Sequence, residues 1–472
     1  MAVTGRFAPS PSGRIHLGNI LCCLLAWLSA RQKGGRVILR IEDLDIARCP
    51  RRYGEQMCRD IQWLGLDWDG PLNYQTQRTE LYNSYVDKLL ETGHAYWCSC
   101  TPEEVEAMRE KARAQGLKPR YNGCCRERNL GPGEGRCVRL KAPQAGKVVF
   151  DDMVKGRIAV DVSELDDMVI RRADGMPTYN MAVVVDDYEM GITHVIRGDD
   201  HVSNTPRQIL IYEALGLPVP TFGHVPMILG PDRQKLSKRH GATSVEEYRD
   251  AGYLSDAFVN YLALLGWSLD GETTVIPRDV LASKFSLDRI SKNPATFDPK
   301  KLDWMNAEYI NAMDDKTFAD KIMLPQLIEA GLIDEGFEAD EAWVDALAAI
   351  VRPRTKMPAD AATVAAPVFK TAETLEYDEK SVAKGLAKEG LGAVLDAAKT
   401  ALEAVTDWTP ENIDAALEPL PEALDVKKRL VFGAVRVAEC GNMVSPPLGE
   451  TMALIGRDDC LARIDRARPM AL

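Results

Sequence analysis

Residues 6–19 have the sequence RFAPSPSGRIHLGN, which indicates how the N-terminal part of the chain folds. An apolar strand over residues 3–8 leads into a turn rich in proline and glycine, and a helix follows over residues 18–32. A strand, a tight loop and a helix N-terminus form an anion site, because backbone N–H groups and the helix dipole point toward the ligand. We therefore expect an anion to bind close to His16 and Gly18.

A second segment, Lys235-Leu236-Ser237-Lys238-Arg239, supplies cations that suit the same anion. Gly18 would let a nucleotide approach the backbone closely, and His16 can hydrogen-bond phosphate oxygens as charge develops on them. Neither motif is specific alone, because a Lys/Arg cluster is usually a solvated surface. Their joint presence in this order predicts a site that binds ATP and reacts at its α-phosphate.

Short apolar strands alternate with helices through residues 1–95, which is typical of a doubly wound parallel sheet. A strand is expected over residues 36–41, after the Gly34-Gly35 turn. The sheet is expected to resume with strands at Met181–Val185 and Ile192–Arg197. Ligands in such folds lie at the carboxyl ends of the strands.

A separate module interrupts the sheet between Tyr96 and about Ala182. Its cysteines are clustered, its turns are rich in glycine and proline, and its strands, such as residues 147–150, are short. These features predict a small inserted domain.

The chain becomes helical beyond Thr243, where Ser244 is a suitable N-cap and Glu246-Glu247 lie in the first turn. From about residue 315 onward Ala, Leu, Glu, Asp and Lys dominate, and apolar residues recur every three or four positions. The breaks in this pattern fall at prolines: Pro353, Pro358, Pro410 and Pro421. This part is predicted to be all-α.

The composition is that of a globular protein, with 46% hydrophobic residues among 472. No apolar run approaches the roughly 18 residues that a membrane span needs, so we expect a soluble, cytoplasmic protein that does not bind membranes. Eleven scattered cysteines favour reduced thiols over a disulfide framework.

The net charge of −12 is unfavourable for nucleic-acid binding, but an acidic protein can carry local basic strips. The candidate strips are Lys111–Arg120, Arg126–Arg128, Arg352–Lys356 and Lys427–Arg436.

The two motifs resemble the signature sequences of class I aminoacyl-tRNA synthetases, and flanking segments narrow the resemblance to the glutamyl-tRNA synthetase family. These segments are Arg6-x-Ala-Pro-Ser-Pro, Arg40–Asp45, Pro177–Asn180, Val184–Gly198, Asn204–Gln208 and Leu302–Asn306. The resemblance is strong over residues 3–310 and more diffuse beyond.

The resemblance implies a multidomain α/β protein with a Rossmann-like catalytic domain in two halves, residues 1–95 and 183–243. Residues 96–182 would bind the tRNA acceptor end, and residues 244–314 would contact its stem. An α-helical anticodon-binding domain would occupy residues 315–472, with two subdomains that meet near 375–400.

The resemblance also implies an ATP-dependent ligase for protein biosynthesis, which forms glutamyl-adenylate and transfers glutamate to the terminal adenosine of tRNA(Glu). We expect it to act as a monomer and to use Mg²⁺. His16, Lys235 and Lys238 would stabilise developing charge. ATP would contact Pro9, Ser10, Pro11, His16, Gly18, Asn19, Lys235, Leu236, Ser237, Lys238 and Arg239.

Glutamate would be held by six residues that match family positions: Arg6, Ala8, Ser10, Glu42, Tyr179 and Arg197. Arg6 would clamp the side-chain carboxylate, which suits a guanidinium, and Glu42 would bind the ammonium group. Arg352 and Arg354, which flank Pro353, are candidate anticodon contacts. An ordinary helix–helix loop with solvated charges would have the same sequence pattern.

The pattern Cys98-x-Cys100 followed by Tyr121-x-x-x-Cys125 indicates zinc in a reduced protein. Many relatives complete the site with a histidine where this chain has Glu127. The fourth ligand could be Tyr121, Glu127 or Cys124, and we favour Tyr121 because its spacing to Cys125 places both side chains on one side of a turn. Alternatively, the metal has been lost and the cysteines only pack.

Other functions share parts of this pattern. A non-discriminating enzyme would also charge tRNA(Gln), and a non-catalytic paralogue would bind tRNA only. A shorter relative that glutamylates a tRNA base lacks the anticodon domain, and the distal part of glutaminyl-tRNA synthetase is a β-barrel. A small-molecule adenylyltransferase would not need the helical third of the chain.

Overall fold

The structure is a computed structural model that describes residues 3–236, 239 and 244–472. The chain divides into two compact units, Met1–Pro299 and Lys300–Leu472. The finer five-part division stays a prediction.

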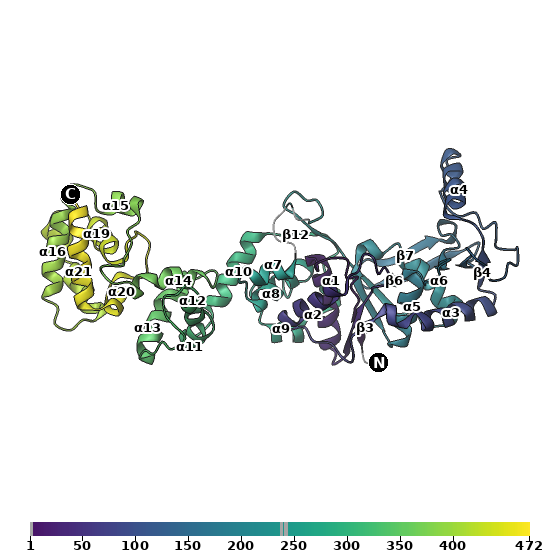
Figure 1. Ribbon diagram of the computed structural model, residues 1–472, viewed down its shortest axis with the longest axis horizontal. Coiled ribbons are helices and arrows are strands. Elements are labelled where there is room, and N and C mark those ends of the chain that lie inside the picture. Colours follow the sequence, from purple (N-terminus) through teal and green to yellow (C-terminus); the bar gives the residue numbers. More distant parts are fainter. Residues whose placement is uncertain (1–2, 237–238, 240–243) are drawn as a thin grey trace. The chain divides into compact units, whose positions relative to one another are not determined.

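A parallel sheet forms the centre of the first unit (Figure 1). Strand β1 (Thr4–Phe7) pairs with β2 (Arg36–Ile41), and β2 pairs with β3 (Asn73–Tyr74). Strand β9 (His194–Gly198) pairs with β10 (Thr221–Val225) and lies beside β1, where the N–H of Thr193 donates to the carbonyl of Thr4 (2.9 Å). The hydrogen-bonded sheets β3-β2-β1 and β9-β10 thus lie side by side as one layer, with β1 next to β9, which confirms the doubly wound fold.

Helices cover both faces of this sheet, because successive side chains of a strand point to opposite sides. Val37 of β2 packs with Ala30 of α1 (Leu17–Arg31). Its neighbour Ile38 belongs to a different core, shared with three other helices. These are α3 (Thr79–Glu91), α5 (Tyr179–Glu189) and α6 (Thr205–Leu215).

The predicted strand at Met181–Val185 is wrong, since these residues lie inside helix α5. All five are buried, so the segment is apolar on every side and shows no helical stripe. A short continuous apolar run does not distinguish a buried helix from a buried strand. The strand expected at Ile192–Arg197 exists as β9.

The inserted module contains an antiparallel sheet and a hairpin. The sheet consists of β4 (Ala95–Cys98), β5 (Cys137–Leu140) and β8 (Val169–Arg171), and the hairpin of β6 (Lys147–Asp152) and β7 (Gly156–Asp161). Helix α4 (Pro102–Ala114) starts with a capping box in which Thr101 and Glu104 satisfy each other's backbone N–H groups.

The described part of the first unit contains six further α-helices and strands. They are α2 (Arg51–Trp63), β11 (Ile228–Leu229), α7 (Val245–Asp250), α8 (Ser255–Gly266), α9 (Arg278–Lys284) and β12 (Ala295–Thr296). Ser244 caps α7 through a capping box with Glu247, as the sequence predicts.

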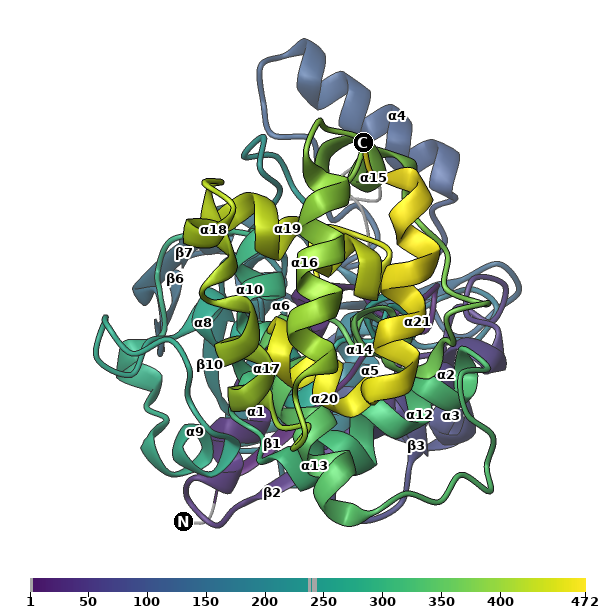
Figure 2. The ribbon, with the colours of Figure 1, turned by 90° about the vertical axis from the view of Figure 1, so that its left-hand side faces the viewer.

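The second unit is helical throughout, with no strand between residues 300 and 472. Helices α16 (Leu391–Glu403), α19 (Lys428–Cys440) and α21 (Arg457–Ala467) lie side by side (Figures 1 and 2). They share a core that includes Leu395, Val435 and Ile464. Pro410 begins α17, where its missing N–H costs nothing. The helices are α10 (Pro299–Asn311), α11 (Asp315–Phe318), α12 (Leu324–Glu329), α13 (Glu341–Val351), α14 (Asp360–Ala365), α15 (Glu379–Gly385), α16 (Leu391–Glu403), α17 (Pro410–Leu417), α18 (Leu420–Ala423), α19 (Lys428–Cys440), α20 (Leu448–Ile455) and α21 (Arg457–Ala467).

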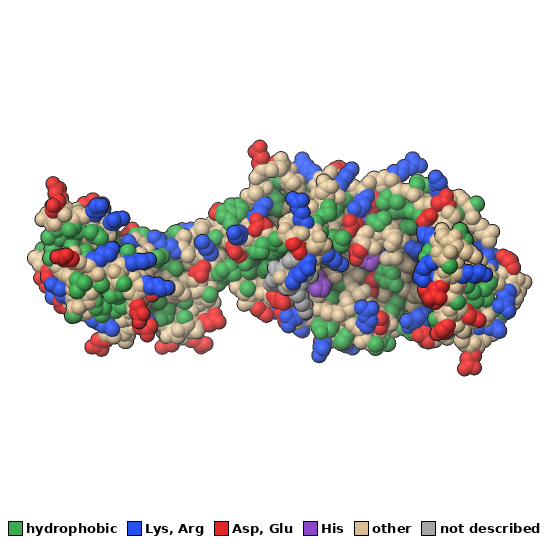
Figure 3. All heavy atoms as spheres, turned by 90° about the horizontal axis from the view of Figure 1, so that it is seen from above, with side chains coloured by type: hydrophobic (Ala, Val, Ile, Leu, Met, Phe, Trp, Pro, Cys, Tyr) green, Lys and Arg blue, Asp and Glu red, His purple; other side chains and the backbone are tan. Residues whose placement is uncertain are grey.

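The surface mixes charges of both signs. On the face shown in Figure 3, Lys and Arg side chains are interspersed with Asp and Glu over both units. Among the described residues, no helix combines the length and apolar character that crossing a membrane requires.

Candidate active site

A cavity of about 250 Å³ lies at the carboxyl ends of β1, β2 and β9. We call it the arginine cavity, after Arg6 and Arg197. All six residues predicted to hold glutamate line it: Arg6, Ala8, Ser10, Glu42, Tyr179 and Arg197. The fold therefore brings together residues that lie almost two hundred positions apart in the sequence.

Arg197 presents one unsatisfied nitrogen in this cavity. Its Nε donates to Nε2 of His224 (3.1 Å) and its Nη2 donates to Oγ1 of Thr205 (2.8 Å), whereas its buried Nη1 has no hydrogen-bond partner. Burial and the nearby charge of Arg6 lower the pKa of Arg197, although Tyr179 opposes the shift. A buried guanidinium with a free donor is well suited to bind a carboxylate.

Arg6 is also buried and only partly satisfied. Its Nη1 donates to the carbonyl of Ile196 at 3.5 Å, and its Nε lies 3.5 Å from Oδ1 of Asp187 without forming a hydrogen bond. The guanidinium is 5% exposed, so a ligand carboxylate would meet it in a largely dry environment.

Glu42 follows β2 directly and is held by two contacts. Its backbone N–H donates to the carbonyl of Pro9 (2.9 Å), and its carboxylate accepts from Nη2 of Arg40 (3.1 Å). Burial raises the pKa of Glu42, while Arg40 and Arg6 counteract this rise. A substrate ammonium would add a further positive charge that stabilises the ionised form.

Tyr179 enters the cavity from the first turn of α5, with His201 as its partner. The Tyr179 hydroxyl lies 3.2 Å from Nδ1 of His201. Burial and the charge of Arg197 lower the pKa of His201 to about 4, so the imidazole is neutral at pH 7. The sequence motifs did not single out His201, because an isolated histidine carries no spacing signal.

A second cavity of about 580 Å³, the motif cavity, joins the two signature segments. Of the residues predicted to bind ATP, it is lined by His16, Gly18, Asn19, Lys235 and Leu236. His16 is the N-cap residue of α1 and forms an isolated antiparallel bridge with Ser244. A Cβ placed on Gly18 would meet nothing within 4 Å, so the glycine borders open space.

The other predicted ATP residues lie elsewhere. Pro9 and Ser10 line the arginine cavity, and Pro11 lines a separate pocket of about 260 Å³. Arg239 pairs with Asp232 (2.8 Å), whereas Ser237 and Lys238 fall outside the described residues.

The two cavities adjoin each other. Asn19, Cys22, Gly198 and Asp200 line both of them. Two ligands could therefore lie in contact, one in each cavity.

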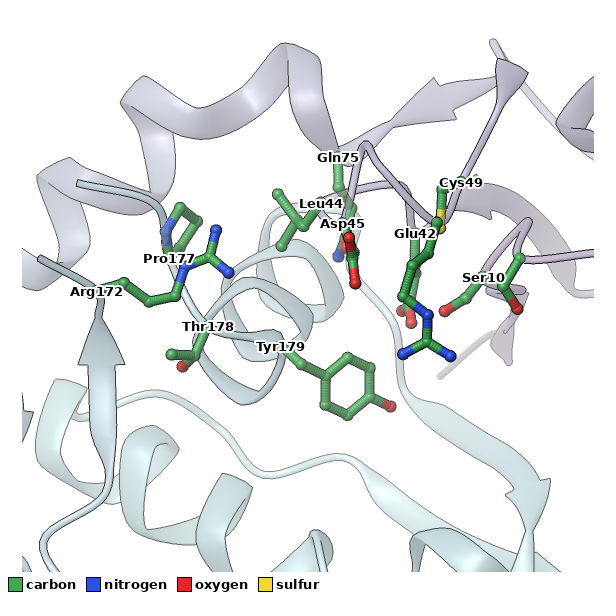
Figure 4. A pocket seen from close by; sticks show the side chains of 12 residues that line it. Ser10, Glu42, Leu44, Asp45, Cys49, Gln75, Arg172, Pro177, Thr178 and Tyr179 are labelled. Carbon is green, nitrogen blue, oxygen red and sulfur yellow. The ribbon is translucent and has the colours of Figure 1, made fainter. Parts of the chain in front are cut away.

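A third cavity of about 460 Å³, the side cavity, shares Ser10, Ser12, Glu42 and Tyr179 with the arginine cavity. In Figure 4, Tyr179 and Arg172 face Glu42 and Ser10 across the opening. Arg48 and Arg172 give this cavity cationic groups that suit a phosphate-bearing ligand.

The cysteines of the inserted module form a compact cluster. The Sγ atoms of Cys98, Cys100 and Cys125 lie within 4.8 Å of one another. The Tyr121 hydroxyl is 3.5 Å from Sγ of Cys98, and Sγ of the exposed Cys124 is 3.4 Å from Sγ of Cys100. Three clustered thiols with a nearby phenol fit a tetrahedral metal.

Two further observations concern which of these side chains would bind a metal. A hydrogen bond with Cys137 lowers the pKa of Cys98 against the effect of burial, which favours the thiolate form that metals bind. Glu127 instead pairs with Lys141 (3.1 Å) and is 77% exposed, which makes it the weakest of the three candidate fourth ligands.

The two candidate anticodon arginines differ in their surroundings. Nε of Arg352 donates to Oδ1 of Asp315 (3.0 Å), which ties it to its own unit. Arg354 is exposed and makes no hydrogen bond or ion pair with the described residues.

Comparisons with known proteins agree with this geometry. Residues 2–304 match the model for the catalytic domain of class I tRNA synthetases (E and Q), and residues 318–468 match an anticodon binding domain. The glutamate–tRNA ligase of Nitratidesulfovibrio vulgaris (strain DP4) is 51% identical, over 98% of this chain and 99% of its own. That of Oleidesulfovibrio alaskensis is 52% identical, with the same coverage.

Solved structures are similar over the whole chain. A glutamate tRNA ligase from Elizabethkingia meningosepticum, crystallised in complex with its amino acid, has a TM-score of 0.88 at 29% identity and covers 99% of each chain. The glutamate-tRNA synthetase of Elizabethkingia anophelis has a TM-score of 0.84, also at 29% identity, and covers 99% of this chain and 100% of its own. The chain thus belongs to the glutamate–tRNA ligase family of class I aminoacyl-tRNA synthetases.

Proposed function

We propose that this chain is a glutamate–tRNA ligase that activates L-glutamate with ATP in the first two cavities and transfers it to tRNA(Glu) for protein biosynthesis. One observation carries the proposal: a cavity with two buried, incompletely satisfied arginines adjoins the cavity that joins both signature segments. An acidic amino acid and a nucleotide would thereby meet at Asn19, Cys22 and Gly198.

Glutamate would lie in the arginine cavity with its side-chain carboxylate on Arg6 and its ammonium group on Glu42. The free Nη1 of Arg197 is a further donor for a substrate carboxylate. Glutamine has no side-chain carboxylate to pair with these guanidinium groups, so it would lose the charge-assisted contacts that glutamate makes with them.

In the first step an oxygen of the α-carboxylate attacks the α-phosphorus of ATP, pyrophosphate leaves, and glutamyl-adenylate forms. His16 and Lys235 border the motif cavity and would stabilise the developing phosphate charge. Lys238 is assigned the same role from its motif. Asp200, which lines both cavities, is the carboxylate available to the Mg²⁺ that accompanies ATP and neutralises phosphate charge.

In the second step the 2′ hydroxyl of the terminal adenosine attacks the activated carbonyl, and AMP leaves. The side cavity opens onto Glu42 and Tyr179 and carries Arg48 and Arg172, so it could admit the end of the tRNA. We expect bound tRNA to help assemble the glutamate site.

The cysteine cluster would hold one zinc ion through Cys98, Cys100, Cys125 and Tyr121. The metal would be structural, because the small core around it consists of five buried residues, three of which are the proposed ligands Cys98, Tyr121 and Cys125. We further propose that the enzyme acts in the cytoplasm as a monomer, and that Arg354 contacts the anticodon.

Two assays test the function. ATP–pyrophosphate exchange should require glutamate and tRNA, and purified transcripts of tRNA(Glu) should be charged with glutamate. Charging of tRNA(Gln) as well would identify a non-discriminating enzyme. A protein that binds tRNA without exchange or charging would be the non-catalytic paralogue, and the proposal would be wrong.

A further inference from the structure

A chain of four alternating charges connects the two predicted glutamate ligands from behind the arginine cavity. Nη2 of Arg40 donates to Glu42 (3.1 Å), and Nη1 of Arg40 donates to Asp187 (2.8 Å). Asp187 in turn lies 3.5 Å from Nε of Arg6. Arg40 is 0% exposed and Asp187 is 2% exposed, so water does not screen these interactions effectively.

Asp187 is the only ion-pair partner of Arg6 among the described residues. A buried guanidinium adopts the orientation that its anionic partner imposes, because an unpaired buried charge is costly. With Nε turned toward Asp187 and Nη1 toward the carbonyl of Ile196, the orientation of Arg6 is set before a ligand arrives. The orientation of the carboxylate clamp therefore depends on a residue of helix α5.

Arg6 and Glu42 each pair with another member of this chain of charges and not with each other. The charge of Arg6 acts on Glu42, but the two form no ion pair, since Asp187 and Arg40 take the opposite charges. Without the carboxylate of Asp187, Arg6 would have no ion-pair partner among the described residues, whereas Glu42 would still have Arg40. The carboxylate of Glu42 lines the same cavity and would then attract Arg6. Their pairing would remove both groups from the substrate.

The neighbouring carboxylate provides an internal comparison. Asp186 is 0% exposed and lies on the same helix, but it accepts hydrogen bonds from three other groups: Nε2 of Gln75 (3.0 Å), Nε of Arg78 (2.7 Å) and the Tyr82 hydroxyl (2.8 Å). Its link to the chain of four charges is an ion pair with Nε of Arg40 at 3.5 Å. It makes no ion pair with Arg6 among the described residues. The two carboxylates thus match in burial and charge and differ in their contact with Arg6.

We infer that Asp187 is a positioning residue for amino-acid selection, which orients Arg6 toward the substrate carboxylate and prevents an internal Arg6–Glu42 pair. The inference rests on the proposed function of the arginine cavity. It concerns glutamate binding alone, since Asp187 does not line the motif cavity.

The test is steady-state aminoacylation by the full-length protein with a tRNA(Glu) transcript, comparing Asp187→Asn with Asp186→Asn. Asp187→Asn should raise KM for glutamate by about 10- to 100-fold and leave kcat and KM for ATP within about threefold, as loss of substrate positioning does. Asp186→Asn should leave KM for glutamate within about threefold. Thermal melts of both variants measure any loss of stability separately.

Equal increases in KM for glutamate in both variants would overturn the inference, as would no increase in Asp187→Asn. If Asp187→Asn does not fold, Asp187→Glu carries the test: it keeps the charge but displaces it, so KM for glutamate should still rise while KM for ATP does not. An unchanged KM for glutamate in that variant would also overturn the inference. Inactive wild-type protein would instead refute the proposed function.

Discussion

His16 and Ser244 form an antiparallel bridge, which joins the first signature segment to the residue that directly follows the lysine loop, residues 235–243. The start of that loop is also tied down, by a bridge between Leu229 and Lys235. Arg14 adds an ion pair with Glu246 (2.9 Å) just beyond the loop. Lys235 and Ser244, the described residues on either side of the loop's centre, are therefore both held by bridges, and Lys235 lines the motif cavity. Lys238 falls outside the described residues.

The first prediction concerns Lys238. Replacing it with alanine should slow adenylate formation by roughly two to four orders of magnitude, because a cation that stabilises the transition state is lost. Pyrophosphate exchange measures the effect, and filter binding should show nearly unchanged tRNA affinity. The exposed Lys284 provides the control as Lys284→Ala. Unchanged turnover in Lys238→Ala would contradict the assigned role.

Arg6→Gln should impair the selection of glutamate. Losing the charged partner of a buried carboxylate costs about 2 to 5 kcal/mol, so kcat/KM for glutamate should fall much more than kcat/KM for an uncharged analogue. The same change at the exposed Arg36 should have no such effect. Equal losses for both substrates would mean that Arg6 does not bind the side-chain carboxylate.

Arg352 and Arg354, which flank Pro353, should have different functions. Arg354→Ala should weaken cognate tRNA binding about tenfold, the loss expected for one hydrogen-bonded charge, and spare exchange at saturating tRNA. Arg352→Ala should instead lower the thermal stability, since Arg352 pairs with Asp315. If Arg354→Ala keeps both its affinity and its preference over anticodon variants, this loop is only structural.

Elemental analysis of protein purified without added metal should find about one zinc per chain. Cys100→Ser should lose the metal together with aminoacylation, whereas Cys58→Ser, on helix α2, should retain both. A fully active preparation without metal would show that the cysteines only pack.

Stability should depend on pH through Glu439, whose carboxylate is fully buried without a hydrogen-bond partner. Burial raises its pKa from 4.5 to about 8, although Cys460 and Arg463 oppose this rise. Below pH 4.5 both the folded and the unfolded protein bind the proton. Between pH 4.5 and 8 the unfolded protein has lost the proton and the folded protein still binds it. The free energy of unfolding therefore falls by about 1.4 kcal/mol for each pH unit as the pH rises through this range.

Glu439→Gln should remove this dependence, because the amide is neutral at every pH. Thermal melts should therefore show the variant gaining stability relative to the wild type between pH 5 and pH 8. Glu411→Gln, at an exposed position, is the matched control. A constant difference between Glu439→Gln and wild type across this range would show that Glu439 is ionised in the folded protein.

Short sequence motifs were sufficient to predict many of the turns and helix starts of this fold. The Pro/Gly turn between β1 and α1 and the Ser244 capping box appear where the sequence places them, because proline, glycine and capping residues act over a few positions. The run Met181–Val185 shows the limit of such signals. Its conformation depends on burial on all sides, which is a property of the packed molecule.

The sequence by itself determined the two signature segments, the order of the strands and helices around them, and the residue types that suit phosphate and glutamate. Only the tertiary structure placed Arg6, Glu42 and Arg197 around one cavity, because parallel strands distant in sequence end at the same edge of a sheet. The tertiary structure also brought Asp187 into contact with Arg6, whereas Asp186 contacts other groups. Two adjacent carboxylates are chemically alike, so their different roles arise from the direction in which the helix presents each one.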